Sequence, residues 1–169
     1  MTMLRFPIGH YLGPHFTAAE DPPVQQVRLG GEIVELTDDE FAVWSSAHGL
    51  NEEKPARHAE ELLARSLLAD VDADSPNDFA ARHRLLPLQL GLGNTPEAPA
   101  MFRSGTAKLP LTGMTRNLYD IWLSSHLSPN LLVACKEHDT SPSAVLTVLH
   151  ALLAHSAACL DLAVTEYQP

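Results

Sequence analysis

Cysteine, basic residues and long apolar runs are all scarce in this chain of 169 residues. The two cysteines, Cys135 and Cys159, can form at most one bridge, which excludes a disulfide framework and agrees with a reducing compartment. No apolar run approaches the roughly 20 residues that span a bilayer, and the N-terminal residues lack the apolar stretch of a signal peptide. The sequence therefore predicts a soluble, cytoplasmic protein that does not bind a membrane.

Basic residues are outnumbered, with 11 Lys and Arg against 21 Asp and Glu and a formal net charge of −10. This balance disfavours sequence-independent binding to a phosphate backbone. Residues 1–79, here called the first half, hold fifteen acids and five bases, whereas residues 80–169, the second half, hold six of each. The two halves therefore face different partners, or only one of them has a partner.

Apolar residues make up 45% of the chain, which excludes global disorder and suffices for the core of one compact domain or two small ones. Residues 70–78 combine aspartates with turn-forming residues, a composition typical of an acidic connector. We therefore place a first unit at residues 1–73, a connector at 74–83 and a second unit at 84–169.

An internal repeat is the strongest pattern in the sequence. Residues 36–48 align with residues 114–126 at a shift of 78, and the two segments share a Thr, a Trp, a Ser and a His in the same order. Residues 62–66 align with residues 152–156 at a shift of 90. These matches keep their order along the chain, which favours a duplicated unit.

Duplication makes a structural prediction about the two tryptophans. Trp44 and Trp122 should occupy equivalent buried positions, each on a helix that follows a hairpin. The alternative is a pair of unrelated amphipathic helices that happen to share a tryptophan.

The first half reads as a hairpin, helices and a closing strand. Residues 24–29 and 32–36 flank two glycines and predict a two-residue hairpin with positive φ. Thr37 and Glu40 form the pattern of a capping box, so a helix should begin there and continue to Gly49.

A further helix is expected over residues 55–67, and a closing strand over 68–71. The second half repeats this plan with one more helix. Thr115 should cap its first helix, Ser128-Pro129 should open a second from Asn130 to about Glu137, and Ser141-Pro142 should open a third. Its closing strand should cover residues 159–162. The first half has about 12 fewer residues between its matched blocks, which predicts that it lacks the middle helix.

The run from Val27 to Phe41, in which a strand ending in Leu-Thr leads into a helix beginning near Glu-Phe, resembles the start of response-regulator effector domains. It is also similar to the small winged helix that brings leader peptides to enzymes of ribosomal-peptide biosynthesis. The resemblance implies an α+β fold of two tandem winged-helix-like units. In the DNA-reading family, the last helix enters the major groove. In the peptide-recognition family, the ligand adds as a strand beside the hairpin and lies against the last helix.

This chain departs from the DNA-reading pattern. The first candidate helix offers Arg57 and Arg65 but also two glutamates, and the second offers His150 and His155. Such helices bring little positive charge to phosphates, whereas net acidity does not oppose binding of a peptide.

Two groups of residues are candidate ligand contacts. The first group consists of acids of the first half, which would select a basic peptide or a basic protein surface. The alternative is that they form a solvated acidic face. These acids are Glu32, Glu35, Asp38, Asp39, Glu60 and Glu61. The candidates in the second half are Arg103, Arg116, Tyr119 and His126.

No catalytic, metal or cofactor motif is recognisable. His48 and His126 follow the matched tryptophans, where a structural role at a helix end is expected. Cys135 and His138 are three residues apart, but a convergent set of three or four metal ligands is not expected. The sequence does not decide whether His10 contacts a ligand.

The sequence thus favours a non-enzymatic recognition or adaptor protein that binds a peptide or a partner protein, which would be basic if the acids form the contact. A sequence-specific DNA-binding regulator is the alternative, and an enzyme without a recognisable motif is the third reading. The identity of the ligand and the oligomeric state are left open.

Overall fold

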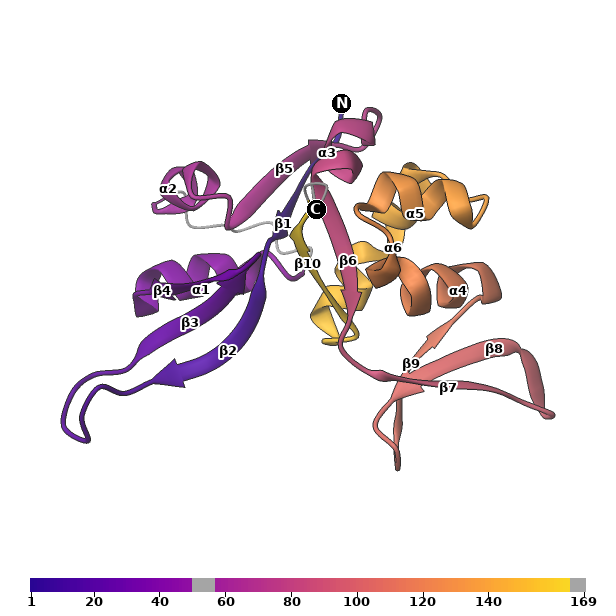
Figure 1. Ribbon diagram of the computed structural model, residues 1–169, viewed down its shortest axis with the longest axis horizontal. Helices are drawn as coiled ribbons and strands as arrows, with labels where there is room; N and C mark the ends of the chain where they lie inside the picture. Colours follow the sequence, from indigo (N-terminus) through magenta and orange to yellow (C-terminus); the bar gives the residue numbers. More distant parts are fainter. Residues whose placement is uncertain (50–56, 165–169) are drawn as a thin grey trace, which may run out of the picture.

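The computed structural model describes residues 1–49 and 57–164, and it is a mixed α and β structure (Figure 1). The first half contains four strands, two helices and a fifth strand: β1 (Met3–Pro7), β2 (His10–His15), β3 (Val24–Leu29), β4 (Glu32–Leu36), α1 (Asp38–Ser46), α2 (Ala59–Ala64) and β5 (Leu68–Asp72). Helix α3 (Asn77–Arg82) then leads into the second half.

The second half has the same order of elements with additional helical segments. They are β6 (His83–Pro87), β7 (Leu90–Thr95), β8 (Ala98–Gly105), β9 (Pro110–Met114), α4 (Arg116–Ser124), the 3-10 helix η1 (Ser125–Leu127), α5 (Leu131–Glu137), α6 (Pro142–Ala154) and β10 (Ala158–Leu162). None of the described helices is both long and apolar enough to cross a membrane.

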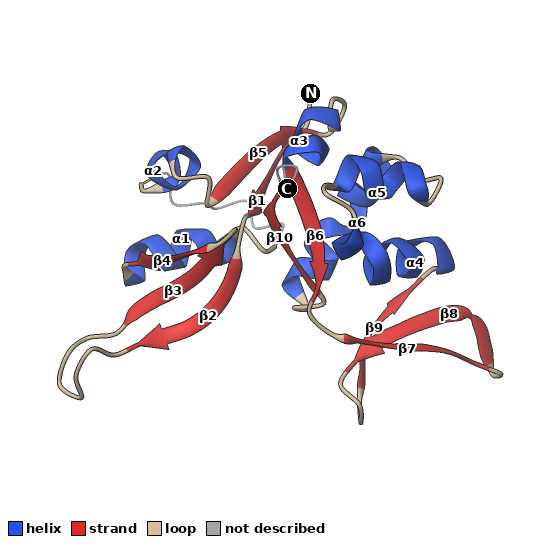
Figure 2. Cartoon of the chain, in the orientation of Figure 1, coloured by secondary structure: helices blue, strands red, loops and turns tan. Residues whose placement is uncertain are grey.

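Each half contains a three-stranded antiparallel sheet and a separate strand pair. Strands β2, β3 and β4 form one sheet, and β7, β8 and β9 form the other. The closing strands pair with the strands that precede these sheets, β5 with β1 and β10 with β6. The two three-stranded sheets lie at opposite lower ends of the molecule, and α4, α5 and α6 gather over the second half (Figure 2).

The expected hairpin and helix starts are present. Leu29 pairs with Glu32 across the glycine turn, and Gly30 has a φ of +59°. The Glu40 N–H donates to Thr37 Oγ1 and the Thr37 N–H donates to Glu40 Oε2, which completes the capping box. Thr115 caps α4 in the corresponding place.

Some expected helix boundaries are wrong. Helix α1 ends at Ser46, before Gly49. Ala47 is its C-cap and keeps a right-handed backbone conformation, so no glycine is required there. Helix α2 covers Ala59–Ala64 where we expected residues 55–67, because His58 and Ser66 adopt left-handed φ values of 70° and 60° that end it on both sides.

Two further expectations concern the remaining helices. Helix α5 covers Leu131–Glu137 with Asn130 as its N-cap, so the helix expected from Asn130 to about Glu137 is present. We also expected the first half to lack the middle helix. The residues concerned are largely 50–56, which lie outside the described residues.

The core joins the two halves. Trp44 is buried in a cluster of first-half residues, whereas Trp122 is buried in a larger cluster that also contains Phe6 and Ile8 from the first half. Phe79, from the segment expected to be a connector, packs its ring 5.5 Å from that of Phe6. The first strand of the chain therefore contributes to the core of the second half.

Polar contacts also cross between the halves. The buried carboxylate of Asp161 on β10 accepts from the Gly30 N–H at 2.7 Å and from Arg28 Nη1 at 3.1 Å. Nη2 of Arg84 lies 3.7 Å from the same carboxylate. The Gly9 N–H donates to the carbonyl of Leu160 at 2.7 Å. These contacts fix β10 against the start of β2.

Candidate functional site

The six candidate acids lie at exposed positions spread over β4, α1 and α2. Glu35 accepts from Gln26, Asp38 accepts from Gln25, and the Glu61 carboxylate lies 3.4 Å from His58 Nδ1. Three of the six acids therefore make separate local contacts, and the six are spread over three elements and not gathered at one point.

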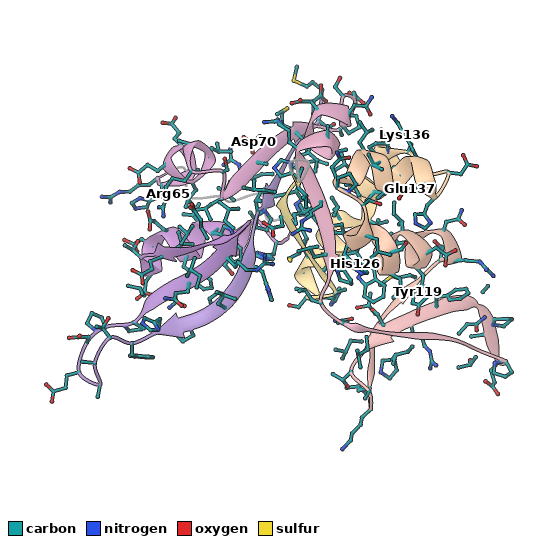
Figure 3. The ribbon with its side chains drawn as sticks, in the orientation of Figure 1. Arg65, Asp70, Tyr119, His126, Lys136 and Glu137 are labelled. Atoms are coloured by element: carbon teal, nitrogen blue, oxygen red, sulfur yellow. The ribbon has the colours of Figure 1, made fainter. Side chains whose placement is uncertain are left out.

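Arg65, at the end of α2, closes one edge of the first sheet (Figure 3). It donates to the carbonyl of Glu35 at 3.2 Å and to the Glu40 carboxylate at 2.8 Å. A strand could add beside β4 at this point only if Arg65 moved away. This surface of the first half, where the family resemblance places the ligand, is therefore partly occupied by the chain itself.

Three of the four candidates in the second half lie around the β7–β8–β9 sheet. Tyr119 is buried, with its ring 5.1 Å from that of Phe102, and its hydroxyl accepts from the Gly93 N–H at 3.2 Å. Arg116 places its guanidinium 5.8 Å from the centre of the Phe102 ring. Tyr119 therefore has a structural role between α4 and the sheet.

The fourth candidate, His126, is exposed in η1, apart from Tyr119 (Figure 3). Its aligned partner His48 is half-buried, donates through Nδ1 to the carbonyl of Ser45 at 2.9 Å, and packs its ring edge-on against Trp44. The expected structural role at the helix end thus holds for His48.

A cleft of about 310 Å³ lies between the two halves, and we call it the central cleft. Its first-half wall comes from the start of β2 and from the end of α1, and its second-half wall comes from the end of α6, the following turn and β10. The lining residues are Gly9, His10, Tyr11, Trp44, His48, Leu88, Leu153, Ser156, Ala158 and Cys159. A hollow that shares five of these residues extends the cleft along α1 to Phe41 and Ser45 and along α6 to Ala154.

The edge of β10 faces the central cleft. In an antiparallel pair, the N–H and C=O of one residue point together toward or away from the partner strand. Ala157 and Ala163 bond to the β6 side, so Ala158, Leu160 and Leu162 direct their main-chain groups away from β6. The carbonyl of Leu160 is taken by Gly9, where the first half covers the strand.

Ala158 lies just beyond this point, where the two halves separate. It is buried and lines the cleft, and among the residues that the structure describes neither its outward N–H nor its outward C=O has a partner. A buried, unpaired main-chain group costs about 1–3 kcal/mol, and such groups are rare in folded proteins. This pair is therefore a donor and an acceptor available to a ligand.

The two histidines of the cleft have lowered pKa values. Burial lowers the pKa of His10 and of His48, and the nearby Arg28 lowers that of His10 further. A neutral imidazole offers one donor and one acceptor. With the aromatic rings of Tyr11 and Trp44, the cleft presents an uncharged, partly apolar lining.

Cys159 shows that the cleft is not arranged for thiol catalysis. Burial and, to a smaller extent, the Asp161 carboxylate raise the pKa of Cys159 to about 12. A nucleophilic cysteine needs the opposite shift. Within residues 1–49 and 57–164, no group of three or more His, Cys, Asp or Glu side chains could hold a metal ion.

No pattern in the sequence predicts the central cleft. The sequence leaves open whether His10 contacts a ligand and predicts a structural role for His48, and it does not mark Tyr11, Ser156 or Ala158 as ligand contacts. The first-half wall, up to His48, and the wall that begins at Leu153 are more than 100 residues apart in the chain, so no local motif joins them. A faint signal was available in the order Pro-x-x-x-x-x-Gly, which occurs at residues 7–13 and again at 87–93, where each half turns into its three-stranded sheet.

Comparisons of the chain with models of known protein families, with curated proteins and with solved structures found no match. The function is therefore inferred from the geometry of the chain itself.

Proposed function

We propose that this protein is a non-enzymatic recognition protein that binds an extended peptide segment of a partner in the central cleft. The observation that carries the proposal is that, within the described part of the chain, the outward N–H and C=O of Ala158 have no partner while the residue is buried at the edge of β10. A peptide that adds as a strand to this edge donates to one group and accepts from the other. The ligand thereby removes the cost of leaving both groups unpaired.

The lining of the cleft supports the same type of ligand. Tyr11 and Trp44 supply a wall for an apolar or aromatic side chain, while Ser156 and the neutral His48 supply polar contacts. A volume of about 310 Å³ lies within the range of small ligand pockets. The hollow along α1 gives an extended chain room to continue beyond the cleft.

A basic partner is favoured by the charge of the first half. Its net charge of −10 attracts cations over a long range and speeds their association. One candidate acid is linked to the cleft through two hydrogen bonds. Asp38 accepts from Gln25, and Gln25 accepts from the hydroxyl of Tyr11 at 2.5 Å. The remaining acids act through the field of the whole half.

The duplication of a winged-helix-like unit is part of this proposal. The halves share their order of elements, their capped helix after the hairpin, and a left-handed serine before the closing strand, Ser66 in one and Ser156 in the other. Trp44 donates to the carbonyl of Ile8, and Trp122 donates to that of Ala157. The two acceptors are near each other in the plan but are not aligned residues. Ile8 follows β1 and bonds to Leu67, whereas Ala157 precedes β10 and accepts from Leu88.

Selection from a phage-displayed library of random peptides tests the proposal. Ala154 ends α6 and lines the extension of the cleft, and Ala64 ends α2 in the aligned position, exposed but outside the cleft. Ala154→Tyr fills the cleft, whereas Ala64→Tyr is a matched control. We expect the selected peptides to bind Ala154→Tyr at least about tenfold more weakly, a loss of about 1.4 kcal/mol, and to bind Ala64→Tyr like the wild type.

Two results would overturn the proposal. One is a library that yields no specific binder, and the other is a set of binders that Ala154→Tyr retains with unchanged affinity. Mass spectrometry of a bound peptide after prolonged incubation separates recognition from catalysis, because cleavage or modification of the peptide would assign the cleft to an enzyme.

A further inference from the structure

The β7–β8–β9 sheet has one face toward α4 and one face turned away from it. Phe102 is on the helix side, where it contacts Tyr119. Ser104 and Thr112 are on the same side, where both hydroxyls donate to Gln89. Because side chains alternate along a strand, the residues between them belong to the opposite, outer face.

The outer face carries three large apolar side chains that are about half exposed: Leu90 at 57%, Met101 at 54% and Leu111 at 48%. We call these three residues the outer patch. Leu90 is opposite Gly105 in the sheet, which places it on the same face as Met101. Gly113 lies beside Met101, where its lack of a side chain keeps the surface flat.

The corresponding sheet of the first half also exposes apolar side chains, among them Leu12 at 46% and Ile33 at 60%. Gln26 and Glu35 are opposite each other in β3 and β4, and the Gln26 amide donates to the Glu35 carboxylate. The corresponding pair in β8 and β9 is Arg103 and Gly113. Both sheets therefore expose apolar side chains, and the first-half face combines them with the polar pair of Gln26 and Glu35. A contiguous apolar patch on a surface is a common sign of an interface.

Charge indicates which partner covers the patch. The first half carries the entire net charge of −10, so contacts that bring two first halves together are opposed by repulsion. The second half is neutral, and its sheet lies at the opposite end of the molecule from the β2–β3–β4 sheet (Figure 1). Two copies that meet through this end keep their acidic halves far apart.

Arg103 lies on the same outer face, and its Nε is buried without a hydrogen-bond partner among the described residues. Because this atom is covered by the chain itself, it does not contact a second copy directly.

We propose that the outer patch is a self-association surface through which two copies of this chain pack their β7–β8–β9 sheets face to face. The same residues meet on both copies, as in other two-fold dimers. Sheets packed in this way are separated by about 10 Å, with their side chains interdigitated. This dimer does not involve the central cleft, so both copies remain able to bind a peptide.

Sedimentation equilibrium of the full chain in about 150 mM salt tests the proposal. Leu111→Glu places a charge in the outer patch, and Ile33→Glu makes the same change at the aligned, exposed position of the first half. We expect the wild type and Ile33→Glu to have about twice the 18.4 kDa mass of one chain. Leu111→Glu should raise the dimer dissociation constant at least about tenfold, and Met101→Glu should have the same effect.

Circular dichroism of each variant separates loss of association from loss of folding. A wild type that stays monomeric at about 100 μM would overturn the proposal. So would an Ile33→Glu variant that dissociates as readily as Leu111→Glu, because the contact would then not depend on the outer patch.

Discussion

At the scale of single residues, aligned positions in the two halves have separated in role. His48 packs against Trp44 and bonds to Ser45, whereas His126 is exposed. The difference follows from the surroundings of each helix end, since the end of α1 faces the other half and the end of α4 continues into η1. Burial therefore perturbs the pKa of His48 and gives it a measurable effect on stability.

The pKa of His48 is lowered in the folded state, so the unfolded chain binds more protons at mildly acidic pH. The stability that neutral His48 contributes is present above about pH 6.5 and is lost as the pH falls through the lowered pKa. We expect His48→Gln to flatten the decline in the free energy of unfolding between about pH 7.5 and pH 5, as measured by urea denaturation. His10 and His83 are shifted in the same direction and will keep part of the slope.

The exposed His126 provides the control for this measurement. His126→Gln should leave the pH dependence as it is in the wild type. Equal slopes for His48→Gln and the wild type would show that burial of His48 does not couple protonation to folding.

At the scale of elements, the turn between β1 and β2 depends on one glycine. Gly9 has a φ of +107°, and a Cβ at this position would lie 2.5 Å from Val27 Cγ1 and 2.9 Å from the carbonyl of Arg28. Its N–H is also the donor that fixes the edge of β10. The turn thus sets both the first sheet and one wall of the central cleft.

We expect Gly9→Ala to lower the free energy of unfolding by about 1–3 kcal/mol, because it combines backbone strain with a close contact. Gly31→Ala is the comparison, since Gly31 has an ordinary φ and nothing within 4 Å of the added carbon. That variant should change stability by no more than about 0.5 kcal/mol. Urea denaturation of the two variants measures the difference, and similar values for both would contradict the turn geometry.

At the scale of the whole molecule, Asp161 is the main polar link between the halves. Its buried carboxylate binds Gly30 and Arg28 from the first half and lies near Arg84 from its own half. Removing one partner from a buried ion pair leaves the other charges uncompensated. The link between the halves should therefore be sensitive to this one carboxylate.

Asp161→Asn should lower the free energy of unfolding by about 3 kcal/mol, near the lower limit for buried pairs because Arg28 is partly exposed. Asp70 forms a comparable pair with Arg5 within the first half, but both side chains are partly exposed. Asp70→Asn should cost at most about 1 kcal/mol. A chemical denaturation series on both variants checks this order, and the reverse order would place the main polar link elsewhere.

Predictions from the sequence were most accurate where the deciding contacts are local. The capping box joins Thr37 to Glu40, three residues away, and the hairpin depends on adjacent glycines. They were least accurate for β1, β2, β6 and β7, which were not expected as strands. These segments are short and interrupted by proline or glycine, and β1 is stabilised by β5, more than 60 residues away.

The amino-acid sequence by itself determined the uneven charge, the order of matched segments and the positions where α1, α4 and α6 begin, because composition and contacts within one turn decide them. Only the tertiary structure decided that β10 meets Gly9 and that a cleft opens between the halves. It also decided that the outward main-chain groups of Ala158 have no partner within residues 1–49 and 57–164. These features arise where segments from opposite ends of the chain pack together. Their geometry depends on which strand edges remain unpaired after folding, and no local pattern of residues specifies that.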